Sequence, residues 1–275
     1  MNDGVLGRRS APLIVGLAAL WLALPVCISA QGQIGPAVVA PPTAPPIVAR
    51  AGAPFDLSGY WVAVVTEDWR YRMVTPDKGD FPGLPLNPEG RRVADSWDPA
   101  KDVASGNQCK SYGAAAIMRV PTRLHITWDN DTTLRIDTDA GMQTRIFHFG
   151  SAPPSGAPSW QGYSVADWEG LRPRGFVLPV VAGSGGPARP PQEGYLKVIT
   201  TQLKPGYLRK NGVPYSANAT VEEYFDSFTE PNGDTWLVVT TIVTDPTYLV
   251  QPFIVSSQYK KTDASGWHPT PCEAK

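Results

Sequence analysis

The stretch Ala219–Asp245, ATVEEYFDSFTEPNGDTWLVVTTIVTD, is the most informative part of the sequence for the fold. Its two arms, Ala219–Ser227 and Thr235–Thr244, alternate apolar with polar residues and are rich in Val, Thr and aromatic residues. A period of two is typical of a β-strand that buries one face. Between the arms stands the turn sequence Pro231-Asn232-Gly233-Asp234. We therefore predict an antiparallel hairpin over this stretch.

The same alternation recurs along the chain. Six further segments have it: Gly59–Thr66, Arg123–Trp128, Thr132–Thr138, Met142–Phe149, Tyr195–Leu203 and Pro252–Lys260. Short connections favour antiparallel pairing of strands that follow each other. About eight strands can close into a barrel, which removes the exposed edges of an open sheet. We therefore predict an all-β fold with an antiparallel barrel of about eight strands.

Two long insertions interrupt the strand pattern. The segment Gly79–Ser105 contains a possible short helix near Glu89–Ser96, and the segment Ser151–Glu193 is rich in Pro and Gly. Long loops at the mouth of a barrel more often bind a ligand or cover a site than support the scaffold. We expect both insertions to lie at a barrel mouth.

The first thirty residues are typical of a secretory signal peptide. Arg8 and Arg9 precede the apolar run Ala11–Val26, and Cys27-Ile28-Ser29-Ala30 supplies small residues for cleavage after Ala30. Cleavage would leave a periplasmic or secreted protein without a stable membrane span. The alternative is a retained anchor, because the apolar segment just reaches the length of a membrane span.

Three segments follow from this interpretation: a signal peptide at 1–30, a spacer at 31–54 and a β-barrel domain at 55–275. The spacer is rich in Pro and Ala, which favours an extended chain. The whole sequence carries 24 Lys and Arg against 25 Asp and Glu, so no excess of positive charge is available to hold a nucleic acid. The sequence indicates no cofactor and leaves the oligomeric state open.

Histidine and cysteine chemistry is sparse. His125, His148 and His268 have no second His or Cys at the spacing of metal ligands, so we predict no metal site. Cys109 and Cys272 are the two cysteines that follow the predicted signal peptide. In an exported chain they favour one disulfide, with two buried free thiols as the alternative.

A series of short segments occurs in order from residue 55 to the C-terminus. They are Asp56-Leu57-Ser58-Gly59-Tyr60-Trp61, Leu86-Asn87-Pro88-Glu89-Gly90, Cys109, Ile117-Met118-Arg119-Val120-Pro121, Arg145-Ile146, Trp160-Gln161-Gly162-Tyr163-Ser164-Val165-Ala166-Asp167-Trp168, Asn211-Gly212-Val213-Pro214-Tyr215-Ser216, Thr244-Asp245-Pro246-Thr247-Tyr248, Pro252-Phe253 and Cys272. Together they resemble a large group of exported bacterial lipocalin-like (calycin-type) β-barrel proteins of unknown function. The resemblance implies a calycin-type barrel, an exported location and the Cys109–Cys272 pairing. It implies no reaction.

Aromatic side chains with polar tips are the main candidates for ligand contacts. Such side chains suit a cavity that holds an apolar molecule and fixes its orientation. With one basic residue and one histidine they make up the predicted ligand-binding set: Trp160, Tyr163, Trp168, Tyr215, Arg145 and His125. The alternative interpretation is that most of the aromatic residues belong to the core.

A hairpin in the middle of the chain supplies a second hypothesis. A three-residue turn at Asp139–Gly141 would place Arg135 opposite Arg145, with Asp137 diagonal to Arg145 on the same face. This Arg/Asp pair could grip a carboxylate, or it could be a solvated ladder in which Asp137 relieves the repulsion between the two arginines.

Three functions are consistent with these observations. The first is a barrel that binds a small hydrophobic molecule as a carrier or scavenger. The second is an enzyme that isomerises, cyclises or hydrolyses a hydrophobic substrate by acid–base chemistry, with Tyr163, Tyr215, Asp137 and Glu222 as candidates. Because Glu222 and Glu223 are adjacent on a strand, one of the two points inward. The third is an envelope interaction module without a small ligand.

Overall fold

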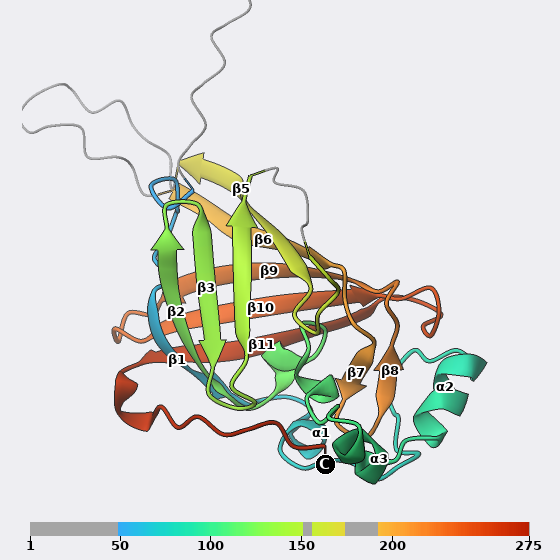
Figure 1. Ribbon diagram of the computed structural model, residues 1–275. Helices are drawn as coiled ribbons and strands as arrows, with labels where there is room; N and C mark the ends of the chain where they lie inside the picture. Colours follow the sequence, from blue (N-terminus) through green and yellow to red (C-terminus); the bar gives the residue numbers. More distant parts are fainter. Residues whose placement is uncertain (1–48, 151–155, 174–191, 275) are drawn as a thin grey trace, which may run out of the picture. The chain divides into compact units, whose positions relative to one another are not determined.

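The barrel is closed and has nine strands. The computed structural model describes residues 49–150, 156–173 and 192–274. The strands follow the order β1-β11-β10-β9-β6-β5-β4-β3-β2 around the barrel (Figure 1). Their bounds are β1 (Gly59–Val64), β2 (Arg123–Asn130), β3 (Thr133–Thr138), β4 (Thr144–Phe149), β5 (Tyr163–Pro173), β6 (Gln192–Thr201), β9 (Thr220–Thr229), β10 (Thr235–Thr244) and β11 (Phe253–Thr262). The predicted all-β barrel is thus confirmed, with one strand more than the eight segments recognised from the sequence.

The additional barrel strand is β5, in a segment that the sequence pattern assigned to a long insertion. Its inward-facing residues include Ser164 and Ala166, which are too small to give a strong apolar alternation. It runs parallel to β4, with Phe147 paired to Ser164, and antiparallel to β6. The prediction of a purely antiparallel barrel is therefore wrong at the β4–β5 pair.

The predicted register of the β3–β4 hairpin is also wrong by one residue. Arg135 pairs with Ile146, and Ile136 pairs with Arg145. The cause is the connection: the Thr138 N–H donates to Gln143 O at 2.9 Å, so four residues, 139 to 142, lie between the paired positions rather than three. A slip of one residue exchanges the two faces of a strand, so Arg145 enters the barrel interior beside Ile136.

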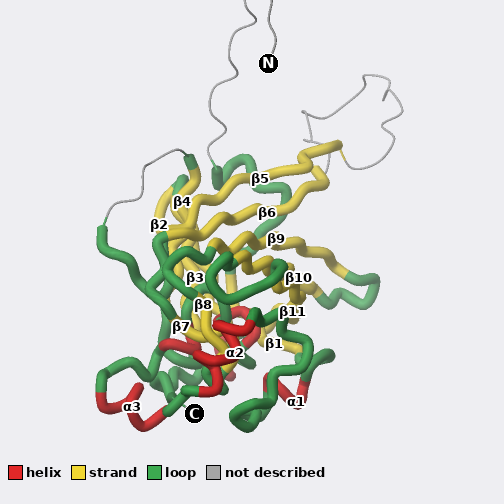
Figure 2. The backbone as a smooth tube through the Cα atoms, turned by 90° about the vertical axis from the view of Figure 1, so that its right-hand side faces the viewer, coloured by secondary structure: helices red, strands yellow, loops and turns green. Residues whose placement is uncertain are grey.

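Helices and a small second sheet gather at one end of the barrel, which we call the helical end. This is the end at which β1 and β6 finish and β2 and β9 begin. The elements there are α1 (Trp69–Arg72), α2 (Pro88–Asp95), α3 (Pro99–Ala104), η1 (Lys110–Tyr112), η2 (Ile117–Arg119), β7 (Gly206–Arg209) and β8 (Val213–Tyr215). Figure 2 shows the helices grouped below the strands. The helix expected near Glu89–Ser96 is confirmed as α2.

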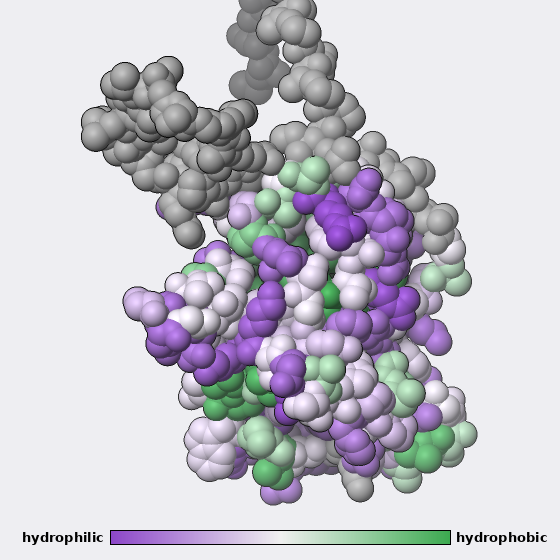
Figure 3. Space-filling view, turned by 90° about the vertical axis from the view of Figure 1, so that its left-hand side faces the viewer, coloured by the Kyte–Doolittle hydropathy of each residue, from purple (hydrophilic) through white to green (hydrophobic). Residues whose placement is uncertain are grey.

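Large apolar side chains fill the interior of the barrel. Trp61, Phe147, Phe225 and Tyr259 are fully buried and belong to one cluster with Leu and Ile side chains from the surrounding strands. The polar atoms of two of them are satisfied, because Trp61 Nε1 donates to Leu57 O at 2.8 Å and Tyr259 Oη donates to the carbonyl of Met118 at 2.8 Å. Residues on the outer wall alternate with these, and the face in Figure 3 is largely hydrophilic with separate apolar patches.

The C-terminal tail is joined to the helical end by a disulfide. After β11 the chain passes through η3 (Ala264–Gly266) and reaches Cys272, which is bonded to Cys109. The bond closes a loop with a sequence separation of 163 residues. The predicted pairing of the two cysteines is thus present, and the alternative of two free thiols is excluded.

The N-terminal part of the described chain lies across the opposite end, which we call the open end. Trp168 Nε1 donates to the carbonyl of Ala49 at 2.8 Å, and the backbone N–H of Arg50 donates to Asp131 O at 3.1 Å. Residues 49–54, the described part of the predicted spacer, are therefore packed on the barrel. The predicted signal peptide and the rest of the spacer lie outside the described residues. Among the described helices, none has the length and apolar character needed to cross a membrane.

Candidate ligand-binding site

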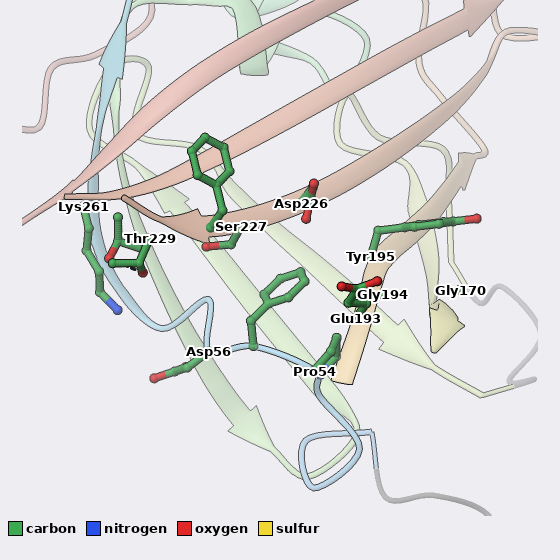
Figure 4. Close-up of a pocket in the computed structure, with 13 residues that line it drawn as sticks. Pro54, Asp56, Gly170, Glu193, Gly194, Tyr195, Asp226, Ser227, Thr229 and Lys261 are labelled. Carbon is green, nitrogen blue, oxygen red and sulfur yellow. Dashed lines mark hydrogen bonds between the residues drawn. The ribbon is translucent and has the colours of Figure 1, made fainter. Parts of the chain in front are cut away.

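A pocket of about 650 Å³ lies at the open end of the barrel, and we call it the open-end pocket. Its lining comes from the segment before β1 and from the adjacent ends of β5, β6, β9, β10 and β11 (Figure 4). The lining residues are Pro54, Phe55, Asp56, Gly170, Glu193, Gly194, Tyr195, Asp226, Ser227, Phe228, Thr229, Thr235 and Lys261. The volume is within the range of about 300–1,000 Å³ that is usual for small-molecule sites.

The pocket exists because two neighbouring strands separate before they end. Pairing between β6 and β9 stops at Leu196 and Phe225, although both strands continue toward the open end. Beyond that point three of the lining residues, Gly170, Gly194 and Ser227, have small side chains or none. Gly170 has a φ of +67° within the irregular part of the β5–β6 pairing, a conformation that favours glycine. The strand divergence and the small side chains together leave the space open.

Aromatic rings form the base of the open-end pocket. Phe55 lines the pocket and packs edge-to-face on Trp168, with ring centroids 5.4 Å apart. Trp168 in turn contacts Phe149 at 5.8 Å, and Phe149 contacts Trp128 at 5.4 Å. This aromatic series continues into the packed interior, so a ligand at the open end would meet an apolar surface on its inner side.

Charged side chains surround the open-end pocket. Figure 4 places Tyr195 and Asp226 on one side and Asp56 and Lys261 on the other. The Lys261 ammonium lies 5.4 Å from the centre of the Trp61 ring, and Asp56 Oδ1 accepts the backbone N–H of Ser58 at 2.8 Å. With Glu193, the lining holds three carboxylates and one ammonium group. The pocket therefore combines an apolar base with a rim of negative excess.

The six residues of the predicted ligand-binding set do not come together. Trp168 lies directly behind Phe55, and Tyr163 stacks on His148 with ring centroids 4.8 Å apart. The other four lie apart from one another. His125 stacks on Tyr60 with ring centroids 4.2 Å apart, and the Lys204 ammonium lies 4.9 Å from the centre of the Trp160 ring. Arg145 is inside the barrel, and Tyr215 is buried at the helical end. Trp168 is thus the one member of the set that contacts the base of the open-end pocket.

The predicted partnership of Arg145 with Asp137 is wrong. Asp137 is hydrogen-bonded to the side chains of Arg135 and Thr144, whereas Arg145 is paired with Glu223 in the interior. The cause is the one-residue change in the hairpin register, which turns Arg145 inward. Arg145 and Asp137 therefore face opposite sides of the sheet.

The remaining catalytic candidate, Glu222, lies on the outer wall. Its carboxylate accepts a hydrogen bond from Tyr224 Oη and lies 3.1 Å from the Lys197 ammonium. The hydrogen bond from Tyr224 holds the pKa of Glu222 below its usual value, and Lys197 acts in the same direction. Of the two adjacent glutamates it is Glu223 that points inward.

A second pocket, of about 380 Å³, lies at the helical end between α2, α3 and the β7–β8 sheet. Asp102 Oδ1 is 2.6 Å from Lys110 Nζ, and Asp102 Oδ2 accepts a hydrogen bond from Tyr207 Oη at 2.7 Å. Burial, followed by the hydrogen bond to Asp102, raises the pKa of Tyr207, so this phenol stays protonated at neutral pH. Because both carboxylate oxygens of Asp102 are engaged, the cluster fastens α3 to η1 and β7.

The sequence pattern did not indicate Asp102, Lys110 or Tyr207, which are too far apart in the chain to form a motif. The short segments that the resemblance is based on do indicate this region, because three of them meet here. The backbone N–H of Asn87 donates to Tyr248 O at 2.9 Å, and Ser216 Oγ donates to Asp245 Oδ1 at 2.8 Å. These contacts join the segments 86–90, 211–216 and 244–248 around the second pocket.

Comparison with known proteins identified no relative of this chain. The scan against protein-family models, the search of curated proteins and the search of solved structures each gave no match. Within the described ranges, no three His, Cys, Asp or Glu side chains gather as they would to hold a metal ion. The chemistry of the two pockets is therefore what indicates a function.

Proposed function

We propose that this protein is an exported, lipocalin-like barrel that binds a small amphipathic molecule in the open-end pocket, as a carrier or scavenger. The observation that carries the proposal is the opening between β6 and β9, which leaves about 650 Å³ lined by aromatic, charged and small residues. A site of this form gives a ligand both a surface to bury and polar groups to orient it.

The lining narrows the class of ligand from hydrophobic to amphipathic. An apolar or ring-shaped part would lie on Phe55, where burial of about 100 Å² of apolar surface contributes roughly 2.5 kcal/mol. Hydroxyl or amino groups of the ligand would reach Asp56 or Asp226 on the rim. A cationic or hydroxylated amphiphile satisfies both parts, whereas a fully apolar molecule would leave the carboxylates desolvated.

The closed interior favours the open end as the binding place. Phe147, Phe225 and Tyr259 already occupy the centre of the barrel and are fully buried. A ligand deep in the barrel would have to displace side chains packed at the density of a protein core. The binding mode is therefore a shallow one, at the mouth.

Export supports a role in the cell envelope or outside the cell. A disulfide such as Cys109–Cys272 persists in the oxidising periplasm or extracellular space and is rare in the cytosol. Together with the signal-like N-terminus, it favours a periplasmic or secreted protein that meets its ligand outside the cytosol.

An enzyme on the same barrel is the second candidate, and the Tyr207–Asp102 hydrogen bond beside the second pocket favours it. Tyr207 would be the proton donor to a substrate bound near Trp97, but burial raises its pKa and makes it a weak acid. The double engagement of Asp102 leaves that carboxylate without a free role as a base, so we rank binding above catalysis.

Native mass spectrometry of the protein purified from its own cell envelope tests the binding proposal. We expect a complex heavier than the polypeptide by the mass of one small molecule, which dissociates on collisional activation. The extracted molecule, added back to ligand-free protein, should bind in a one-to-one ratio by isothermal titration calorimetry. A polypeptide of bare mass that also fails to bind a panel of cationic and hydroxylated amphiphiles would overturn the proposal.

A further inference from the structure

Three arginines converge on one small cavity at the helical end, which we call the arginine cavity. Arg72 ends α1, Arg119 ends η2 and Arg209 ends β7. Their exposed fractions are 6%, 8% and 8%, so each is more than nine-tenths buried. The cavity between them has a volume of about 30 Å³ and is also lined by Ser111 and Lys210.

Each of the three guanidinium groups is held in place by part of its hydrogen-bonding capacity. Arg72 Nε donates to the carbonyl of Arg119 at 2.9 Å, and Arg72 Nη1 donates to Glu67 Oε1 at 2.6 Å. Arg119 Nη2 donates to Asp68 Oδ2 at 2.8 Å. Arg209 Nη2 donates to the carbonyl of Pro82 at 3.3 Å, and the Arg209 guanidinium lies 4.4 Å from the centre of the Tyr71 ring. These contacts fix the direction of the nitrogens that remain.

One nitrogen of each arginine is left over. Arg72 Nη2, Arg119 Nη1 and Arg209 Nη1 are buried and have no hydrogen-bond partner among the described residues. A buried donor without a partner costs about 1–3 kcal/mol, and more for a charged group. Three such donors, on residues that line one cavity, are expensive for the fold unless a ligand accepts their hydrogen bonds.

Charge in this region is also unbalanced. Arg72, Arg119, Arg209 and Lys210 line the cavity, and no acidic residue does. The nearest paired carboxylates, Glu67 and Asp68, are already bound to Arg72 and Arg119. Burial lowers the pKa of Arg72 and of Arg209, and the positive charge of Arg119 lowers both further. An anion in the cavity would remove this repulsion.

We propose that the arginine cavity binds one compact oxyanion, a phosphate or sulfate group. Guanidinium forks match the oxygens of such groups, and donors from three separate elements suit a tetrahedral acceptor. The small volume of the cavity excludes a drug-sized molecule. The site is at the opposite end of the barrel from the open-end pocket, so it is independent of the proposed carrier function.

The same chemistry could come from a free ion or from the headgroup of an anionic lipid. Three exposed apolar side chains on and after α1, those of Trp69, Met73 and Val74, lie next to Arg72 in the chain. Inorganic phosphate and phosphatidylglycerol vesicles are therefore both used as probes, and phosphatidylcholine vesicles serve as the neutral reference.

Binding of inorganic phosphate is measured by isothermal titration calorimetry and by the thermal unfolding midpoint, at constant ionic strength adjusted with sodium chloride. We expect saturable binding of one phosphate and a midpoint that rises with phosphate concentration. If the protein is retained on phosphatidylglycerol vesicles and inorganic phosphate releases it, the bound group is a lipid headgroup. Phosphate binding without retention on vesicles assigns the free ion. Absence of both phosphate binding and vesicle retention overturns the proposal.

The variant Arg209→Gln tests the assignment, with Arg70→Gln as its matched control. Arg209 and Arg70 both stack on Tyr71, but Arg70 is exposed, paired with Asp80 and outside the cavity. We expect Arg209→Gln to weaken phosphate binding about tenfold or more, because one charged hydrogen bond is lost, and Arg70→Gln to leave it unchanged. The readout is the increment that phosphate produces, so a change in basal stability does not obscure it. Equal weakening in both variants would show a general effect of surface charge and overturn the proposal.

Discussion

Arg145 and Glu223 form a bidentate ion pair inside the barrel, with Nη1 2.9 Å from Oε1 and Nη2 2.5 Å from Oε2. Both side chains are fully buried. Arg145 comes from β4 and Glu223 from β9, and β5 and β6 separate these strands in the wall. The pair therefore connects distant parts of the barrel across its interior, and Thr200 on β6 accepts a further bond from Arg145 Nη2 at 3.4 Å.

The first prediction concerns the loss of one member of this pair. Glu223→Gln leaves the Arg145 charge buried without its counter-charge, so the free energy of unfolding should fall by about 3–5 kcal/mol. The double variant Arg145→Met/Glu223→Leu removes both charges and should regain most of that loss. Glu222→Gln is the matched control, because Glu222 is the neighbouring residue on the outer wall, and its effect should stay within about 1 kcal/mol. Urea denaturation measures all three. Equal losses in Glu223→Gln and Glu222→Gln would contradict the structural role of the pair.

A second prediction concerns the disulfide. Replacing Cys109 and Cys272 by Ser frees the C-terminal tail in the unfolded chain, and the bond closes a loop with a sequence separation of 163 residues. We expect the free energy of unfolding to fall by about 2–5 kcal/mol, measured by urea denaturation without reductant. Reductant should lower the stability of the wild-type protein by a similar amount and leave the double serine variant unchanged. A wild-type protein that is insensitive to complete reduction would count against this contribution.

The strands could be predicted from the sequence because apolar and polar residues alternate along a strand that buries one face. All eight predicted segments coincide with strands, and Thr235–Thr244 has the same bounds as β10. β5 escaped prediction because the inward side chains Ser164 and Ala166 are small and do not stand out from the polar ones. β7 and β8 are too short, at four and three residues, for a period of two to be recognisable.

The candidate sites could not be predicted to the same extent, for a physical reason. The open-end pocket is lined by residues such as Gly194 and Ser227, which matter because they are small and because two strands diverge beside them. The arginine cavity joins Arg72, Arg119 and Arg209 from three separate elements. Neither arrangement corresponds to a recognisable spacing of residues in the sequence. The predicted Arg145–Asp137 pair depended on the register of the hairpin, and a connection longer by one residue was enough to remove it.

A third prediction is a pH dependence at the β3–β4 hairpin. Burial alone would raise the pKa of Asp137, but hydrogen bonds from Arg135 and Thr144 outweigh it and hold this pKa below its usual value. A carboxyl whose pKa is lower in the folded state stabilises the fold above its unfolded pKa of about 3.9, and this stabilisation disappears as the pH falls through the folded pKa. Asp137→Asn should therefore cost about 0.2–1 kcal/mol at pH 7 and progressively less below about pH 4. Asp131→Asn is the control, because it makes the same change in the turn between β2 and β3. Urea denaturation at a series of pH values measures the difference, and a cost of Asp137→Asn that stayed constant down to pH 2 would refute the assignment to this carboxylate.

The fourth prediction concerns the open-end pocket itself. Thr229 lines this pocket near the end of β9 and is exposed, so Thr229→Trp can place an indole in the cavity without disturbing the core. We expect this variant to keep its thermal unfolding midpoint and to lose at least about tenfold in affinity for the bound amphiphile, because the ring occupies the volume that the ligand needs. Thr244→Trp is the control, since Thr244 is also exposed but lies at the other end of the barrel wall, on β10. Calorimetric titration of both variants with the molecule recovered from the native protein measures the effect. Unchanged affinity in Thr229→Trp, or an equal loss in Thr244→Trp, would place the ligand elsewhere on the protein.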